Sequence, residues 1–398
     1  MQFVKGMDVS MTKELEAYGA RYYLNGQEED LFRILKSCGT NMIRLRIWQD
    51  PYDEEGHPYG GGENDLETTI ELAQRTRENG MEFLLDFHYS DFWADPGKQM
   101  KPKAWEGLTG EQLEAAVYLH TLYVLKTLKN HQLIPQMVQI GNEITNGFLW
   151  PDGYIGTTED RDDSKDGVDR HDSENSEGRE DSEDRRDSED THDGKGYHVE
   201  KMAALLSAGI RAVRKECPDA KIVLHLDFGT NNEMYRHWFD AIAPFGVDYD
   251  IIGMSYYPHW NGSLAQLLSN MNDVSRRYGK DVMIAETSIG YTTQDMGCKG
   301  IVYTDEEAKV TGYPASPEGQ EHYLRDLCST VRSVEGGHGI GIFYWEPAWI
   351  PVPECNWATP IGSAYMKDTV EAGNTMANQA LFDKRGNANP ALLNLASM

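Results

Sequence analysis

Eight short apolar runs recur along the 398-residue chain at a fairly even interval, and this spacing constrains the fold more than any other feature. Segments with helix-type periodicity lie between the runs, as in residues 31–38. The interval is broken once, between the fourth and fifth runs, by a polar segment at 157–196. With this segment set aside, the pattern predicts one (β/α)8 barrel over residues 1–398. The predicted strands are Phe3–Val9, Met42–Trp48, Glu82–His88, Met137–Glu143, Ile222–Asp227, Ile251–Ser255, Val282–Glu286 and Gly339–Trp345.

The polar segment at 157–196 contains 17 acidic and 7 basic residues, and thus supplies more than a third of the formal net charge of −28. Its only aliphatic residue is Val168. A segment with so little to bury cannot offset the entropy lost on ordering. We therefore predict a disordered loop inserted after the fourth strand. The Gly-centred spacing of an EF-hand is missing, which disfavours a calcium site within it.

The composition restricts the possible partners. A net charge of −28 would repel phosphate backbones and anionic membrane surfaces, which argues against nucleic-acid and membrane binding. No run of about 18 apolar residues is present, and the segment 1–8 lacks the features of a signal peptide. The expected location is cytoplasmic as the sequence stands, or secreted if a signal was removed.

The five cysteines form no C-x-x-C pair, so neither a disulfide framework nor a zinc site is predicted. Separately, we expect the protein to be a monomer.

Two glutamates end predicted strands at the edge where a barrel carries its chemistry. Glu143 ends the fourth strand, directly after Asn142, and Glu286 ends the seventh. The two carboxyls should face each other across one pocket, because these strands lie on opposite sides of the ring. A single strand-end glutamate is usually a solvated or helix-capping group. A facing pair suits glycosidic cleavage, in which one carboxyl protonates the leaving oxygen and the other stabilises or attacks the anomeric carbon.

Tryptophans cluster at the same edge. By default they could be core residues, but at strand ends and in the loops that follow, their rings could stack on the apolar faces of pyranose units. The five candidates are Trp48, Trp93, Trp260, Trp345 and Trp349.

Several long motifs make the sequence similar to glycoside hydrolase family 53, the endo-β-1,4-galactanases. The resemblance covers nearly the whole chain outside 157–196. The motifs in the third and eighth strands are the most specific, whereas Asn-Glu in the fourth is shared by a wider clan of retaining barrel glycosidases. The matching segments are Gly6–Ser10, Asp86–Pro96, Val138–Glu143, Gly253–Pro258, Ala285–Thr287, Phe343–Trp349 and Asn378–Asp383.

The resemblance implies a retaining endo-acting hydrolase of the β-1,4-galactan side chains of pectin, with Glu143 as acid/base and Glu286 as nucleophile. Within that mechanism, we expect Asn142 to hydrogen-bond the sugar 2-hydroxyl and Arg46 to keep Glu286 ionised. Either Tyr257 or Tyr256 should orient Glu286, since the pleat of the strand sends only one of the two side chains inward. The remaining predicted substrate-binding residues are Asp86, His88, Trp93, His225, Tyr256, Trp260, Trp345 and Trp349.

Two departures from the family limit what the resemblance implies. Bacterial members often hold calcium in the loop after the seventh strand, but only Asp295 of such a ligand set is present here, so we predict no metal and no cofactor. Some relatives bridge the loops that carry Cys298 and Cys355, which we expect to stay reduced without an export signal. The alternatives are a mannanase or glucanase of the same clan, and a catalytically silent galactan-binding barrel. Retention of both glutamates argues against the silent barrel.

Overall fold

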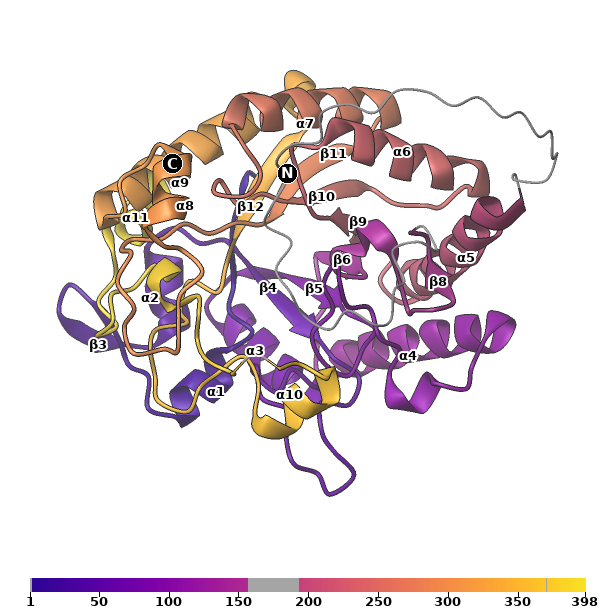
Figure 1. Cartoon of the computed structure of the whole chain (residues 1–398), viewed down its shortest axis with the longest axis horizontal. Coiled ribbons are helices and arrows are strands. Elements are labelled where there is room, and N and C mark those ends of the chain that lie inside the picture. Colours follow the sequence, from indigo (N-terminus) through magenta and orange to yellow (C-terminus); the bar gives the residue numbers. More distant parts are fainter. Residues whose placement is uncertain (1, 157–192, 370) are drawn as a thin grey trace, which may run out of the picture.

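The computed structural model describes residues 2–156, 193–369 and 371–398. Within these residues eight parallel strands form a closed barrel in the order β1-β12-β11-β10-β9-β6-β5-β4 (Figure 1). This confirms the predicted barrel, and every predicted strand corresponds to one in the ring. The strands are β1 (Val4–Asp8), β4 (Met42–Ile47), β5 (Glu82–Phe87), β6 (Met137–Ile140), β9 (Lys221–Leu226), β10 (Ile251–Ser255), β11 (Asp281–Glu286) and β12 (Gly339–Trp345).

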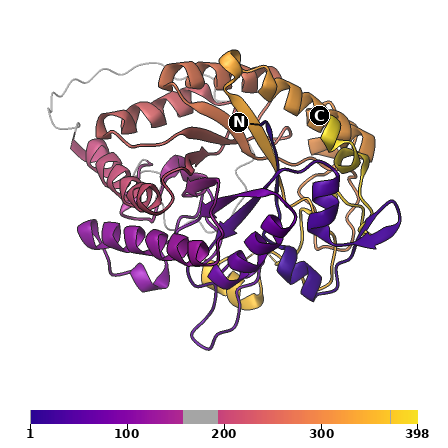
Figure 2. The ribbon, with the colours of Figure 1, turned by 180° about the vertical axis from the view of Figure 1, so that it is seen from behind.

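Helices connect consecutive barrel strands and surround the barrel, as Figures 1 and 2 show from opposite sides. Local sequence explains where they begin and end. In α7, for example, Ser263 and Gln266 form a capping box, and Gly279 ends the helix in the left-handed conformation at φ 62°. The connecting helices are α2 (Leu31–Ser37), α3 (Leu66–Glu78), α4 (Gly110–Asn130), α5 (Asp193–Glu216), α6 (Asn232–Ile242), α7 (Leu264–Tyr278) and α9 (Pro317–Arg332).

Short elements decorate the loops of this barrel. They were not predicted, because segments of two to seven residues seldom show a clear periodicity; α2, with seven residues, is an exception. They are α1 (Thr12–Ala17), β2 (Tyr22–Leu24), β3 (Gln27–Glu29), β7 (Gly147–Phe148), β8 (Gly153–Tyr154), α8 (Asp305–Thr311), α10 (Pro360–Met366) and α11 (Pro390–Leu393).

The barrel interior is closed by one apolar side chain from each of the eight strands. All eight are buried, so this layer is a packed core below the polar strand ends. A glycine makes room for it: a Cβ at Gly6 would lie 2.1 Å from the ring of Phe343, with which it pairs in the β1–β12 register. The layer consists of Val4, Met42, Leu84, Met137, Val223, Ile251, Met283 and Phe343.

The predicted insertion follows the fourth barrel strand, after the β7–β8 hairpin. The prediction that it is a disordered loop concerns residues 157–192, which lie outside the described residues. Its last residues, 193–196, belong to α5, which begins at Asp193. A helix that is already stabilised by a packed face extends at little further cost, even through residues without an apolar face.

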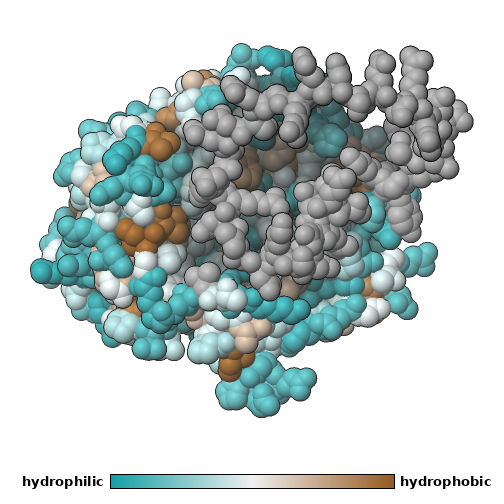
Figure 3. All heavy atoms as spheres, viewed as in Figure 1, coloured by the Kyte–Doolittle hydropathy of each residue, from teal (hydrophilic) through white to brown (hydrophobic). Residues whose placement is uncertain are grey.

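The surface seen in Figure 3 is mainly hydrophilic wherever described residues are visible. None of the helices in the described part of the chain is long and apolar enough to cross a membrane.

Candidate active site

The carboxyl ends of the barrel strands surround a cleft of about 390 Å³. Glu143, which follows β6, and Glu286, at the end of β11, both line it. The cleft therefore brings together the two carboxyls that the strand pattern singled out. The predicted site residues that line it are Arg46, His88, Trp93, Asn142, Glu143, Tyr257, Trp260, Glu286 and Trp345.

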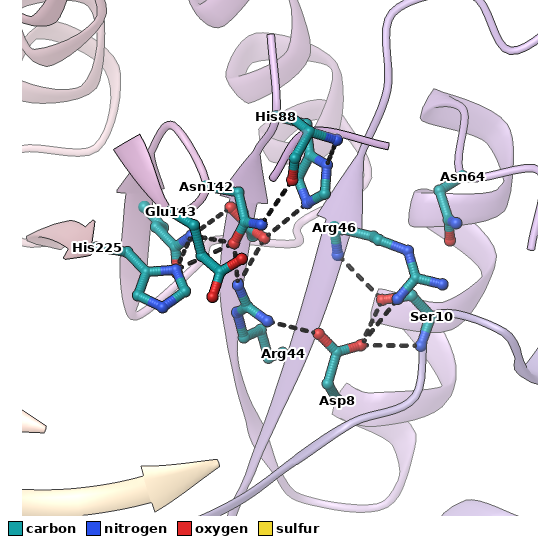
Figure 4. Close-up of polar contacts among 12 residues, drawn as sticks. Asp8, Ser10, Arg44, Arg46, Asn64, His88, Asn142, Glu143 and His225 are labelled. Carbon is teal, nitrogen blue, oxygen red and sulfur yellow. Dashed lines mark hydrogen bonds and ion pairs between the residues drawn. The ribbon is translucent and has the colours of Figure 1, made fainter. Parts of the chain in front are cut away.

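A fully buried guanidinium organises the floor of the cleft. Arg44, in β4, donates to Asp8 at 2.9 Å and to Glu286 at 2.8 Å through Nη1. Its Nη2 donates to Asp86 and to the side-chain oxygen of Asn142, both at 2.8 Å. Figure 4 shows Arg44 between Asp8 on one side and Asn142 on the other. Charge-assisted bonds of this length are strong, so this one side chain fixes the positions of four others.

The prediction that Arg46 keeps Glu286 ionised is wrong, because Arg44 makes that contact. Arg46 instead donates to Glu346 at 2.6 Å and to the Gly61 carbonyl at 3.1 Å. Residues two apart on a strand share a face but lie at different depths. Arg44 pairs in register with Asp8 of β1, so Arg46 lies one step nearer the rim of the barrel.

At the rim, Arg46 packs against an aromatic wall of the cleft. Its guanidinium carbon lies 4.3 Å from the centroid of the Trp93 ring, a cation–π contact. Its partner Glu346 is buried, and burial raises the pKa of that carboxyl to about 8 against the opposing charge of Arg46. Arg46 thus positions Trp93 rather than the catalytic candidate Glu286.

Glu143 occupies a strained position directly after β6. Its backbone is left-handed at φ 47°, which is uncommon for a residue with a side chain. The Ser255 hydroxyl donates to its Oε1 at 2.5 Å. Burial raises the pKa of Glu143 well above its usual value, and the nearby charges of Glu286 and Asp227 raise it further.

Glu286 differs from Glu143 in having a cation beside it. Burial raises the pKa of Glu286, and the Arg44 guanidinium opposes this shift. The Tyr257 hydroxyl donates to its Oε2 at 3.1 Å. Tyr256 does not reach the cleft, since its hydroxyl donates to the Gly262 carbonyl at 2.8 Å. The pleat therefore turns Tyr257 toward Glu286, and the expectation that Tyr256 lies in the site is wrong.

Three further predicted residues do not line this cleft. Asp86 and His225 are both fully buried below it, where Asp86 binds Arg44 and His225 contacts Ser255. Asp86 pairs in register with the cleft residue Arg46, so its contact with Arg44, rather than its place along β5, keeps its carboxylate out of the cleft. Trp349 is 2% exposed and lines a neighbouring cleft.

That second cleft, of about 240 Å³, shares Trp93 and Trp345 with the first. Their ring centroids are 6.3 Å apart. The two clefts therefore form one continuous groove that runs past the carboxyls and along a wall of aromatic rings. The tryptophans that line the second cleft are Trp93, Trp345, Trp349 and Trp357. Trp48, the remaining tryptophan singled out in the sequence, is buried at 1% exposure.

Several residues of the cleft were missed in the sequence. Ser255 ends β10 and Asp227 directly follows β9, so their position at strand ends was the available signal. Arg44 lies within β4, two residues before the predicted Arg46. Burial raises the pKa of Asp227 to about 6. Three other missed residues, Ala94, Asp95 and Pro96, lie inside the matched segment Asp86–Pro96, which was the available signal for them. Nothing in the local sequence marks the rest, which lie in loops: Phe228, Asn261 and Met376.

Asp295, the residue that matched part of a calcium ligand set in the sequence, lies in the loop after β11. The Asp295 carboxylate accepts backbone N–H groups of its own loop from Gly297 and Cys298. Among the described residues, the group close enough to share an ion is Asp53, Glu55 and His57, outside both clefts. All five cysteines are buried free thiols, including Cys298 and Cys355.

A closed parallel barrel with two glutamates lining one cleft at the carboxyl ends of its strands defines a glycoside hydrolase of the barrel type. The family model for glycosyl hydrolase family 53 matches residues 4–395, so the chain belongs to that family.

Named relatives agree with this assignment. An endo-β-1,4-galactanase of Bacillus subtilis (strain 168) is 36% identical over 98% of this chain and 84% of its own length. An uncharacterized protein of Niallia circulans is 41% identical over 96% of this chain and 91% of its own. Among solved structures, a family 53 catalytic domain from Ignisphaera aggregans has a TM-score of 0.83 at 37% identity, covering 99% of this chain and 95% of that one.

Proposed function

We propose that this chain is a retaining endo-β-1,4-galactanase that acts as a monomer on the galactan side chains of pectin. The observation that carries the proposal is the asymmetry of its two glutamates: both line one cleft, but of the two only Glu286 has a guanidinium bound to it among the described residues. Relatives with the printed name endo-β-1,4-galactanase or arabinogalactan endo-β-1,4-galactanase support the substrate class.

The asymmetry assigns the two roles. The neighbours of Glu143 include the charges of Glu286 and Asp227, so Glu143 keeps its proton and is the acid. The Arg44 guanidinium favours the ionised form of Glu286, which makes Glu286 the nucleophile. Glu286 attacks the anomeric carbon while Glu143 protonates the leaving oxygen. Glu143 then removes a proton from the water that cleaves the glycosyl–enzyme bond, and regains its own proton.

The surrounding residues suit a neutral sugar chain. Arg44 and the Ala94 carbonyl fix the amide of Asn142 at the edge of the cleft, where it can bond a sugar hydroxyl. Trp93 and Trp345 line both clefts, and Trp260, 44% exposed, lines the first cleft together with the carboxyls. A groove that extends beyond the carboxyls along several aromatic rings suits an internal segment of a polymer, and thus endo cleavage.

A polysaccharide panel tests the proposal. We expect release of reducing ends from linear β-1,4-galactan, at a rate at least tenfold above that from β-mannan or carboxymethylcellulose. The Glu286→Ala protein serves as the control for contaminating activity. A preference for mannan or carboxymethylcellulose would show instead that the chain is a mannanase or a glucanase of the same clan. Retention of galactan on an affinity gel without any cleavage would indicate a silent binding barrel.

A further inference from the structure

Ser255 connects the acid/base candidate to the interior of the barrel. Among the residues that the structure describes, Ser255 provides the side-chain hydrogen bond to the Glu143 carboxyl, at 2.5 Å. Its own oxygen lies 2.9 Å from Nε2 of His225. Glu286, in contrast, is held by two side chains, Arg44 and Tyr257. The orientation of the Glu143 carboxyl therefore depends on one hydroxyl.

His225 is itself immobilised. It is fully buried, and its Nδ1 lies 3.0 Å from the side-chain oxygen of Asn142 and 3.2 Å from Nε2 of Gln139. Burial lowers the pKa of His225 well below its usual value, and the charge of Arg44 lowers it further, so the ring is neutral. A neutral imidazole has one N–H and one bare nitrogen, and a fixed ring gives the serine a fixed partner.

We propose that Ser255, anchored by His225, is a positioning residue that holds the Glu143 carboxyl toward the leaving oxygen in both halves of the reaction. The inference rests on the proposed function of Glu143 as acid/base. Gln139 donates to Nδ1 of His225, so the ring carries its proton on Nε2 and donates it to Ser255. The Ser255 hydroxyl therefore donates to Oε1 of Glu143 whether or not the other carboxyl oxygen carries the acid proton. An apolar side chain at this position cannot make this bond.

The test compares two substrates with different leaving groups. In Ser255→Ala, kcat/KM on β-1,4-galactan should fall about 10- to 30-fold. This is a part of the rate enhancement that general acid catalysis usually supplies. On a β-1,4-galactobioside of a dinitrophenol, which leaves without protonation, kcat/KM should stay within about threefold. We choose kcat/KM because it reports only the steps up to departure of the leaving group.

The pH profile gives a second readout. Ser255 donates to the carboxylate and so lowers the pKa of Glu143, against the raising effects of burial and of Glu286, Asp227 and Asp95. Its removal should therefore move the alkaline limb of the kcat/KM profile on galactan to higher pH. Ser255→Thr restores a hydroxyl and should restore the limb together with most of the activity.

Ser288→Ala is the matched control. Ser288 is a fully buried serine just after β11, and its hydroxyl donates to Gln379 at 2.7 Å, away from the cleft. The Ser288→Ala variant should lower the thermal midpoint about as much as Ser255→Ala does. Its kcat/KM should change equally on the two substrates, and the alkaline limb of its pH profile should stay in place. Equal losses on both substrates in Ser255→Ala, or an unmoved limb, would overturn the inference. Failure of the unmodified enzyme to cleave galactan would instead overturn the proposed function.

Discussion

Glu286→Ala is expected to lower kcat on galactan by roughly 10⁴-fold or more, and to do the same on an activated aryl galactobioside. A better leaving group cannot replace a missing nucleophile, so changing the substrate gives no recovery. The measurement is initial-rate kinetics on both substrates. Circular dichroism and the thermal midpoint check that the variant is folded.

Glu143→Ala provides the comparison. It should lose most activity on galactan but retain measurable turnover of the aryl substrate, whose phenolate leaves unaided. Added azide should accelerate that turnover, because it attacks the glycosyl–enzyme intermediate without a general base. Equal losses in the two variants on the aryl substrate would contradict the assignment of the roles.

Arg44→Met should cost both activity and stability. Asp8, Asp86 and Glu286 would then face one another in the barrel without the guanidinium that now binds all three. Breaking a buried ion pair on one side typically lowers the free energy of unfolding by about 3–5 kcal/mol. We expect a loss of this size at pH 8, together with a fall in kcat/KM of about 10³-fold, which is about 4 kcal/mol.

The loss should shrink as the pH is lowered. Burial raises the pKa of Glu286 and Arg44 opposes this shift, so removal of the cation should raise that pKa further in the folded state. Folding is then favoured by protons and weakens as pH rises through the folded-state value. Urea unfolding at pH 5 and pH 8 measures the difference. The control is Arg214→Met, which removes a partly exposed pair with Asp248 and Asp250 and should cost about 1 kcal/mol or less. A loss in Arg44→Met that matched the control at both pH values would show that Arg44 does not organise the floor.

The barrel could be predicted because strands buried on both faces are continuous apolar runs, and eight such runs alternate with helix-period segments. The β10 and β12 strands have the predicted bounds, Ile251–Ser255 and Gly339–Trp345. The β2–β3 and β7–β8 hairpins could not be found this way, since strands of two or three residues leave no pattern.

The position of a residue along its strand predicted which side chains gather at the cleft, but not how deep each one lies. Arg44 and Arg46 lie on the same face of β4, because residues two apart on a strand share a face. Their spacing alone does not tell which of the two side chains reaches Glu286. That depends on the register between β4 and β1, where Arg44 is paired with Asp8. The same limit put Asp86 and His225 in the cleft, although both are buried beneath it. Loop residues such as Phe228 depend on how long-range contacts fold the loops.

The anomeric configuration of the first product tests the central claim most directly. Proton NMR can follow the new reducing end while linear β-1,4-galactan is hydrolysed, before mutarotation mixes the anomers. A nucleophilic Glu286 with its carboxyl about 5–5.5 Å from that of Glu143 gives retention, so the β-anomer should appear first and the α-anomer should follow more slowly. Initial release of the α-anomer would show inversion and contradict the assignment of Glu286 as nucleophile.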